Sequence, residues 1–168
     1  ALLAARCTTV EKVAWETHAT TDLKRGTNEV LDIDVGGVTS GILEIEPYEV
    51  AEGRIIADHE DDGAMTVAFL GHEIAERLFS GVDPIGKEMR IRGQAFTVVG
   101  VAKKKGSFLG FSQDNFVKIP FRTHRKVFGG TRSINISVKA RDSSRMAECA
   151  DEVGSVLRIS EAEAGQDA

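Results

Sequence analysis

The clearest alternation of apolar and polar positions lies in the middle of the chain. Val67–Gly71 is a short apolar run that ends in glycine, which predicts a buried strand. In His72–Phe79 the apolar residues fall at helical spacing, so one face of a short helix can pack against its neighbours. Lys87–Ile91 alternates polar and apolar residues, and Phe96–Val101 is more continuously apolar. Together these two runs predict a β-hairpin with a glycine-containing loop.

Turn residues and a second strand and helix surround this central unit. Pro84 fixes φ and Gly86 permits a positive φ, so Asp83–Gly86 is expected to form a sharp turn. Phe116–Pro120 is predicted to be a strand that stops at its proline. A short helix over Phe121–Phe128 should follow and end at the glycines behind it.

The two ends of the chain carry patterns that fit one another. Residues 10–35 predict two antiparallel strands joined by a loop at 23–28. Ser133–Ala140 alternates strictly and predicts another strand. A helix from Ser144 to about Ile159 should follow, capped by Asp142 or Ser143, with Met146, Cys149, Val153, Val156 and Leu157 on one face. Ala1–Cys7 has the pattern of the end of a helix.

These elements predict an α+β fold in two parts. Gly36–Gly41 interrupts the strand pattern and marks the expected subdomain boundary. The order helix, strand, strand and later strand, helix suits a ferredoxin-like sandwich that lacks its first strand, built from residues 1–40 and 131–160. Residues 41–130 would then be an inserted, small β-rich subdomain. The polar residues 161–168 are expected to form a flexible tail.

Composition and charge narrow the functional class. The 168 residues are 42% hydrophobic and carry a net charge of −5, with both signs mixed, which argues against a nucleic-acid-binding protein. No run approaches the roughly 20 apolar residues of a membrane helix, and no signal peptide is visible. Because the chain begins without Met inside a helical pattern, we expect it to be an excerpt of a longer protein.

The search for chemistry in the sequence finds no catalytic, cofactor or metal site. The acidic run Asp58–Asp62 fits no metal-binding spacing and is expected to be a solvated turn. His18, His72 and His124 are isolated from one another and are expected at the surface or in caps. The residues from Gly100 to Ser107 fail the phosphate-loop pattern, and no nucleophile motif occurs. We therefore expect no enzyme activity and no ATP hydrolysis by this chain.

One loop stands out as a candidate contact surface. Lys103–Lys105 is a basic run that ends the predicted hairpin, and it is either a solvated end or a contact for acidic lipid headgroups or an acidic partner. Directly after it, Phe108, Leu109 and Phe111 lie in a loop spaced by glycines. Such a loop either tucks its apolar side chains into the core or presents them to a partner or substrate.

Several of these segments, in this order, resemble a known family. The run Val67–Gly71, then Leu78 and Phe79, then Asp83–Lys87, then Phe96–Val101 resembles the periplasmic core domain of MacB-type ABC transporter permeases, a broad family that includes FtsX-like and LolC-like permeases. Gly53–Arg54 and the segment from Asp114 to Phe121 extend the resemblance to nearly the whole chain. The resemblance implies a porter-type subdomain with an inserted Sabre-type subdomain, in which Asp83–Gly86 and Gly53–Arg54 are structural.

The resemblance also implies a function and partners. It implies a periplasmic domain of a bacterial inner-membrane permease, which is dimeric and served by a separate ATP-binding domain or subunit. Such a domain transmits ATP-driven movement and contacts a periplasmic adaptor or the transported substrate, without a cofactor. The alternative is a self-contained extracytoplasmic ligand-binding or sensor domain, which requires a concave pocket with converging polar groups.

The two cysteines leave a question open. Cys7 and Cys149 lie near opposite ends of the chain, each in a helical pattern. They are either ordinary buried thiols or, if the domain is periplasmic, partners in a disulfide. We hypothesise that the terminal helices lie side by side and bring the two thiols close together.

Overall fold

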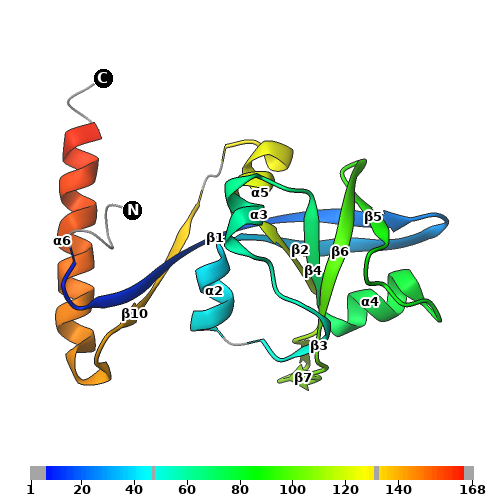
Figure 1. The fold of residues 1–168 in the computed structure, drawn as a ribbon, viewed down its shortest axis with the longest axis horizontal. Coiled ribbons are helices and arrows are strands. Elements are labelled where there is room, and N and C mark those ends of the chain that lie inside the picture. Colours follow the sequence, from blue (N-terminus) through cyan, green and yellow to red (C-terminus); the bar gives the residue numbers. More distant parts are fainter. Residues whose placement is uncertain (1–6, 47, 131–132, 165–168) are drawn as a thin grey trace.

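A long β-hairpin organises the computed structural model, which describes residues 7–46, 48–130 and 133–164 (Figure 1). Leu23 and Val30 pair near its tip, and the positive φ of Gly26 closes the turn between the strands. The elements are, in chain order, β1 (Val10–Arg25), β2 (Asn28–Val38), α2 (Ser40–Ile45), β3 (Val50–Gly53), α3 (Asp58–Asp62), β4 (Val67–Leu70), α4 (His72–Phe79), β5 (Glu88–Ile91), β6 (Gln94–Ala102), β7 (Ser107–Phe108), β8 (Phe111–Ser112), β9 (Phe116–Pro120), α5 (Phe121–Phe128), β10 (Asn135–Ala140), a 3₁₀ turn (Ser143–Arg145) and α6 (Met146–Ala164).

Most strands belong to one sheet that closes on itself. Its order is β10-β1-β2-β9-β4-β6-β3, and β5 pairs with both β6 and β1. The strands β1, β2, β9, β4, β6 and β5 therefore form a ring in which each strand is hydrogen-bonded to the next. This ring is the body of the molecule. A closed ring leaves fewer unpaired strand edges than an open sheet does.

The main core lies within this body and is shared with α4. Its buried side chains come from β1, β2, β4, β5, β6 and β9, and α4 adds Ile74, Ala75, Leu78 and Phe79. These are the four positions that the sequence places on the apolar face of the helix. The predicted strand, helix, turn and hairpin of the central segment are confirmed, and Gly86 has the expected positive φ of 75°.

The glycines at the end of β2 do not interrupt the strand, so the predicted break at Gly36–Gly41 is wrong. β2 continues to Val38, and α2 begins at Ser40. A Cβ on Gly36 would lie 2.8 Å from Lys118 Cδ, and one on Gly37 would lie 2.4 Å from His124 Cβ. The glycine pair is therefore a site of close side-chain approach within a strand.

An arm extends from the body at the left of Figure 1 and consists of α6, β10 and the first part of β1. A small core of Cys7, Val10, Ala140, Cys149 and Val153 joins these segments. The Glu152 carboxylate, on α6, accepts hydrogen bonds from the backbone N–H groups of Thr8 and Thr9 at 2.7 Å and 3.0 Å. The start of the described chain is thereby fixed to the C-terminal helix.

The mixed α+β class is confirmed, whereas the two-part division stays a prediction. Hydrogen-bonded pairing runs without interruption across residue 40, because β1 belongs both to the arm and to the ring. α6 continues to Ala164, so it includes the first half of the segment 161–168, whose flexibility stays a prediction. The helix expected over Ala1–Cys7 falls, apart from Cys7, outside the described residues.

Candidate interaction surface

The loop singled out in the sequence is a small β-hairpin with an apolar tip. β7 and β8 pair in antiparallel register, Phe108 opposite Phe111. Leu109 and Gly110, with φ of 50° and 83°, form the tight turn between them. The exposed fractions of Phe108, Leu109 and Phe111 are 64%, 82% and 79%. Of the two alternatives for this loop, the structure therefore has the exposed one. We call these three residues the apolar tip.

Asp114 holds the base of this hairpin. It is 4% exposed, and its two carboxylate oxygens accept the backbone N–H groups of Lys105 at 2.8 Å and Gly106 at 2.7 Å. The Gln113 N–H donates to the Gly106 carbonyl at 2.9 Å, which closes the loop. A carboxylate that accepts two amides fixes both of them, so the base of the hairpin has a defined geometry.

The same base is joined to the start of α4. The Ser112 hydroxyl donates to Glu73 Oε2 at 2.6 Å, and the Glu73 N–H donates to the Asp114 carbonyl at 3.2 Å. Gly71 precedes the helix, and a Cβ at that position would lie 2.2 Å from the Asp114 carbonyl oxygen. The apolar tip is therefore presented on a support that is packed against the core helix.

The three lysines beside the tip are held to different degrees. The Lys103 ammonium pairs with Glu49 at 2.8 Å, and that of Lys105 lies 4.8 Å from the centre of the Tyr48 ring. Lys104 is exposed, and it has no ion pair with any residue that the structure describes. The base of the hairpin is therefore basic, whereas its tip is apolar.

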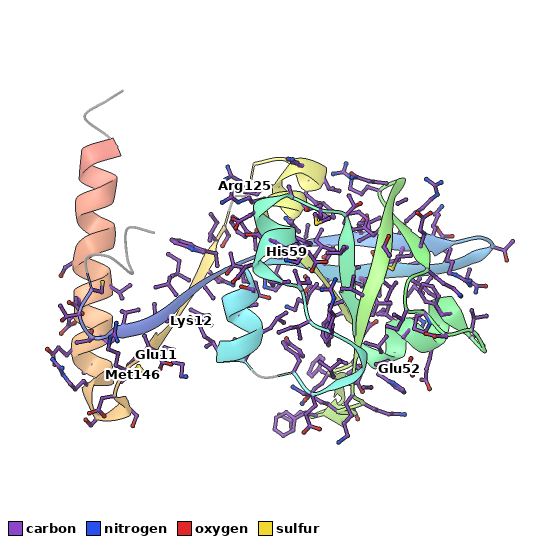
Figure 2. The ribbon with its side chains drawn as sticks, viewed as in Figure 1. Glu11, Lys12, Glu52, His59, Arg125 and Met146 are labelled. Atoms are coloured by element: carbon purple, nitrogen blue, oxygen red, sulfur yellow. The ribbon has the colours of Figure 1, made fainter. Side chains whose placement is uncertain are left out.

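A hollow lies along α4, close to the hairpin. Its floor is formed by Ala75, Phe79, Val82, Pro84 and Val101, and its volume is about 460 Å³. Three carboxylate residues line it: Glu52, Glu76 and Asp83. We call it the acidic hollow. Figure 2 labels Glu52 on the side of the molecule that also carries α4 and the hairpin. No single segment of the sequence indicates this hollow, because its residues come from β3, α4, the following turn and β6.

The acidic run Asp58–Asp62 is a helix and not a solvated turn, so that prediction is wrong. Glu60 and Asp61 are buried, with exposed fractions of 2% and 9%. The Arg54 guanidinium forms a bidentate pair with Glu60 at 2.7 Å and 2.8 Å, and this pair lowers the pKa of Glu60. Gly53–Arg54 therefore has the structural role that the family resemblance implies.

Three of the histidines, His18, His72 and His124, lie in different environments. His72 lies 3.2 Å from Glu76 on the surface of α4. His18 lies 2.9 Å from Asp34 and 3.5 Å from Glu16, and hydrogen bonds to these carboxylates raise the pKa of His18 to about 9. The Glu16 carboxylate also accepts a hydrogen bond from the buried Lys118 ammonium. A chain of alternating charges thus crosses β1, β2 and β9.

His124 is a core residue, so its expected place at the surface or in a cap is wrong. It is 1% exposed and stacks on Phe128 with 4.5 Å between ring centres. Its ring nitrogens form no hydrogen bond with the residues that the structure describes. Burial lowers the pKa of His124 to about 4, although the nearby Val35 backbone offsets part of the effect. Its isolation in the sequence carries no signal of this burial.

Cys7 and Cys149 lie in the same small core between the chain start and α6. Both are buried and free in the structure. Burial raises the pKa of the Cys7 thiol, and the neighbouring Glu152 and Cys149 act in the same direction. The predicted proximity agrees with this shared core, whereas the disulfide stays a prediction. Titration of thiols in unfolded, unreduced protein would show two reactive groups if the bond is absent.

Two further features are absent from the part of the chain that the structure describes. Residues 7–46, 48–130 and 133–164 contain no group of three or more metal-ligating side chains close enough to hold an ion. Within the same ranges, no helix is both long enough and apolar enough to span a bilayer. Another hollow, of about 790 Å³, is lined by residues that include Asp58, Asp62 and Arg122, so it carries acidic and basic side chains together. The apolar tip and the acidic hollow are the candidate contact surfaces.

Known proteins are similar to this chain in sequence and in fold. The family model of the MacB-like periplasmic core domain matches residues 1–156. The chain is 30% identical over 154 residues to the macrolide export ATP-binding/permease protein MacB of Syntrophobacter fumaroxidans, covering 91% of this chain and 21% of that protein. It is 33% identical over 114 residues to the pyoverdine export ATP-binding/permease protein PvdT of Pseudomonas aeruginosa, covering 67% of this chain and 17% of the relative. The chain thus spans about a fifth of the length of these relatives.

Two solved structures share the fold. The extracellular domain of the noncanonic ABC-type transporter YknZ from Gram-positive bacteria has a TM-score of 0.82 at 22% identity, with 95% of this chain and 80% of that chain covered. The periplasmic region of MacB from Actinobacillus actinomycetemcomitans has a TM-score of 0.80 at 20% identity, with 93% and 70% covered. From the family model and the curated relatives, we conclude that this chain belongs to the MacB-like periplasmic core domains of ABC transporter permeases.

Proposed function

We propose that this domain couples cytoplasmic ATP hydrolysis to export by moving as a rigid body outside the membrane. In this proposal residues 1–40 and 131–160 form the porter-type part of the parent permease, and residues 41–130 form the inserted Sabre-type part. An ATP-binding domain or subunit drives the movement, the parent protein is a membrane-embedded dimer, and this domain has no enzyme activity of its own. The continuous pairing from β10 through β1 into the ring supports rigid transmission, because β1 belongs both to the arm and to the ring, where it pairs with β5 of the inserted part.

The observation that carries the proposal is the exposed apolar tip on its fixed support. Phe108, Leu109 and Phe111 are each more than half exposed, although the chain has a well-filled core. Clustered apolar side chains on a protein surface commonly mark a site of contact. Because the base is held by Asp114 and by α4, docking of the tip costs little conformational entropy. The tip is thus suited to grip a periplasmic adaptor or the transported substrate.

The position of the tip agrees with a contact away from the arm. In Figure 1, the hairpin containing β7 lies at the lower edge of the body, whereas α6 runs towards the upper left. A partner on the tip would therefore contact the ring and not the arm. This arrangement supports an outward-facing contact for the apolar tip.

The test is the double variant Phe108→Ser/Phe111→Ser in the full-length transporter. Its matched control is Leu31→Ser, because Leu31 is 57% exposed on β2, outside the tip. Efflux of a macrolide and of a pyoverdine siderophore, the cargo classes named for the relatives, would be measured in cells. We expect the tip variant to lose at least about tenfold in efflux, equal to 1.4 kcal/mol. Equal efflux by the tip variant and the control would contradict the proposal.

A further inference from the structure

We propose that a cavity beside α5, where β1 passes from the arm into the ring, binds a small, uncharged aromatic alcohol. The cavity has a volume of about 300 Å³, at the lower end of the range that is typical of small-molecule sites. Its walls come from β1, from the second half of α5 and from the segment that leads into β10. This site goes beyond the proposed function and does not depend on it.

The cavity lies at the point where β1 changes its pairing partner. β1 pairs with β10 as far as Glu16, which lies opposite Asn135, and it pairs with β2 from Glu16 onwards. Thr17–Ala19 line the cavity directly after this point, and His124 and Phe128 line it from α5. Asn135, the first residue of β10, also borders it. The cavity is therefore shared by the arm and the ring.

The imidazole of His124 is the group that points to a ligand. The side chain is 1% exposed, and neither ring nitrogen has a hydrogen-bond partner in the described part of the chain. Burial lowers the pKa of His124 to about 4, so at pH 7 the neutral ring presents one N–H donor and one lone pair. Because a buried polar group without a partner costs free energy, a group that both donates and accepts is expected beside it. A hydroxyl has both capacities.

The His124 ring is held in place by its neighbours. A Cβ on Gly37 would lie 2.4 Å from His124 Cβ and 2.6 Å from His124 Cγ, so the side chain rests directly on β2. The Phe128 ring stacks on the imidazole with 4.5 Å between the ring centres. In a close-packed interior such contacts fix a side chain in one rotamer. Phe128 and Ala19 add apolar walls beside the imidazole, and this combination suits an aromatic ring that carries a hydroxyl.

The charges around the cavity favour an uncharged ligand. The described residues that line it include no lysine, arginine, aspartate or glutamate. The ionised side chain among them is His18, and its ring nitrogens already lie 2.9 Å from Asp34 and 3.5 Å from Glu16. A charged ligand would lose its hydration without meeting a free opposite charge. A neutral hydroxyl that meets an imidazole nitrogen has no such cost.

The experiment titrates the 168-residue chain with phenol at pH 7 and follows the ring-nitrogen chemical shifts of His124 by NMR. Three further probes each lack one feature: anisole has no hydroxyl hydrogen, benzoate is charged, and glycerol has no ring. We expect phenol alone to shift the His124 nitrogens, with a dissociation constant on the order of 1 mM for a ligand of its size. An unchanged spectrum with phenol would mean that only water occupies the cavity and would overturn the inference. Equal shifts with anisole, benzoate or glycerol would also overturn it.

Two variants test the walls of the cavity. His124→Phe keeps a ring against Phe128 and removes both nitrogens, so phenol should bind about tenfold more weakly, as read from the amide shifts of Thr17 and Phe128. Ala19→Leu fills the cavity from β1 without removing a polar group, so the phenol-dependent shifts at His124 should disappear. The amide spectrum of each variant reports whether it is folded.

The same substitutions at other places are the matched controls. His59→Phe changes an exposed histidine on α3, which Figure 2 labels, and Ala95→Leu changes a half-buried alanine on β6. Both should leave the affinity for phenol unchanged. Unchanged affinity in a folded Ala19→Leu protein, or equal weakening in the variants and the controls, would contradict the proposed site. The four probes on the wild-type chain decide the question even where a variant does not fold.

Discussion

At the scale of single residues, the burial of several ionisable side chains is the feature that the sequence does not predict. Glu60, Asp61, Lys118 and His124 are polar residues that sequence patterns assign to the surface, yet all four are buried. Three of them depend on a neighbour distant in sequence: Asp61 accepts the Arg122 N–H, Lys118 pairs with Glu16, and His124 lies over Gly37. Glu60 instead pairs with Arg54, six residues away. Local patterns carry no information on such pairs. By contrast, the apolar tip could be singled out because three large apolar side chains lie among glycines.

The two perturbed histidines predict a maximum of stability near pH 6.5. The folded-state pKa of His18 is about 9, above its ordinary value of 6.5, so its contribution is full below pH 6.5 and is lost as pH rises through 9. The folded-state pKa of His124 is about 4, so its contribution is full above pH 6.5 and is lost as pH falls through 4. The free energy of unfolding, measured by urea titration against pH, should fall on both sides.

Two single variants separate the acidic and the alkaline slopes of the free energy of unfolding against pH. His18→Gln should flatten the alkaline slope between about pH 6.5 and 9, and His124→Gln should flatten the acidic slope between about pH 4 and 6.5. Each variant should leave the other slope in place, even where the total stability is lower. Imidazole titrations of the wild-type protein near pH 6.5 for both residues would contradict this account.

At the scale of elements, short local patterns predict more than long-range pairing. α4 and α5 have the predicted bounds, because periodicity and turn residues are local signals. The predicted hairpin also forms, with strands at Glu88–Ile91 and Gln94–Ala102 instead of Lys87–Ile91 and Phe96–Val101. The closure of the sheet could not be predicted in this way. It depends on Leu23 and Lys24 pairing with Ile91 and Arg90, residues far apart in the chain. A glycine that permits close packing within a strand cannot be told from one that breaks a strand by sequence alone. The Gly36–Gly37 pair therefore predicts a break where β2 in fact continues.

The β7–β8 hairpin should lose its fixed geometry when Asp114 is changed. Asp114→Asn keeps the size of the side chain but replaces one accepting oxygen by an N–H donor, so one of the amides of Lys105 and Gly106 loses its partner. We expect hydrogen exchange at these amides to accelerate by about tenfold or more, as the cost of an unpaired amide of about 1–3 kcal/mol implies.

A matched variant controls for the general effect of removing a carboxylate cap. Asp142→Asn removes the carboxylate that accepts the Ser144 N–H at 2.9 Å, at the start of the segment leading into α6. It should leave exchange at the hairpin unchanged. If Asp114→Asn also leaves these amides unchanged, the support described for the apolar tip is not what holds it.

At the scale of the whole molecule, the architecture is an arm joined to a closed ring by one shared strand. The resemblance in the sequence predicts the family and the periplasmic location, and the family model and relatives confirm both. Sequence patterns could not show where the arm and the apolar tip lie relative to each other. In the structure, the arm lies at one end of the ring and the β1–β2 turn at the other, and the β7–β8 hairpin lies at the lower edge between them (Figure 1). The proposed transmission of movement depends on that arrangement.

The proposed function requires that the apolar tip contacts another protein or the cargo in the working transporter. The most direct measurement places a photo-crosslinking amino acid at Leu109, the most exposed tip residue at 82%, in the full-length protein in cells. The same probe at Leu31 is the control. We expect a cross-linked product at Leu109 that is absent at Leu31 and that decreases when ATP hydrolysis is blocked. Illumination that yields no product at Leu109, or the same product at both positions, would contradict it.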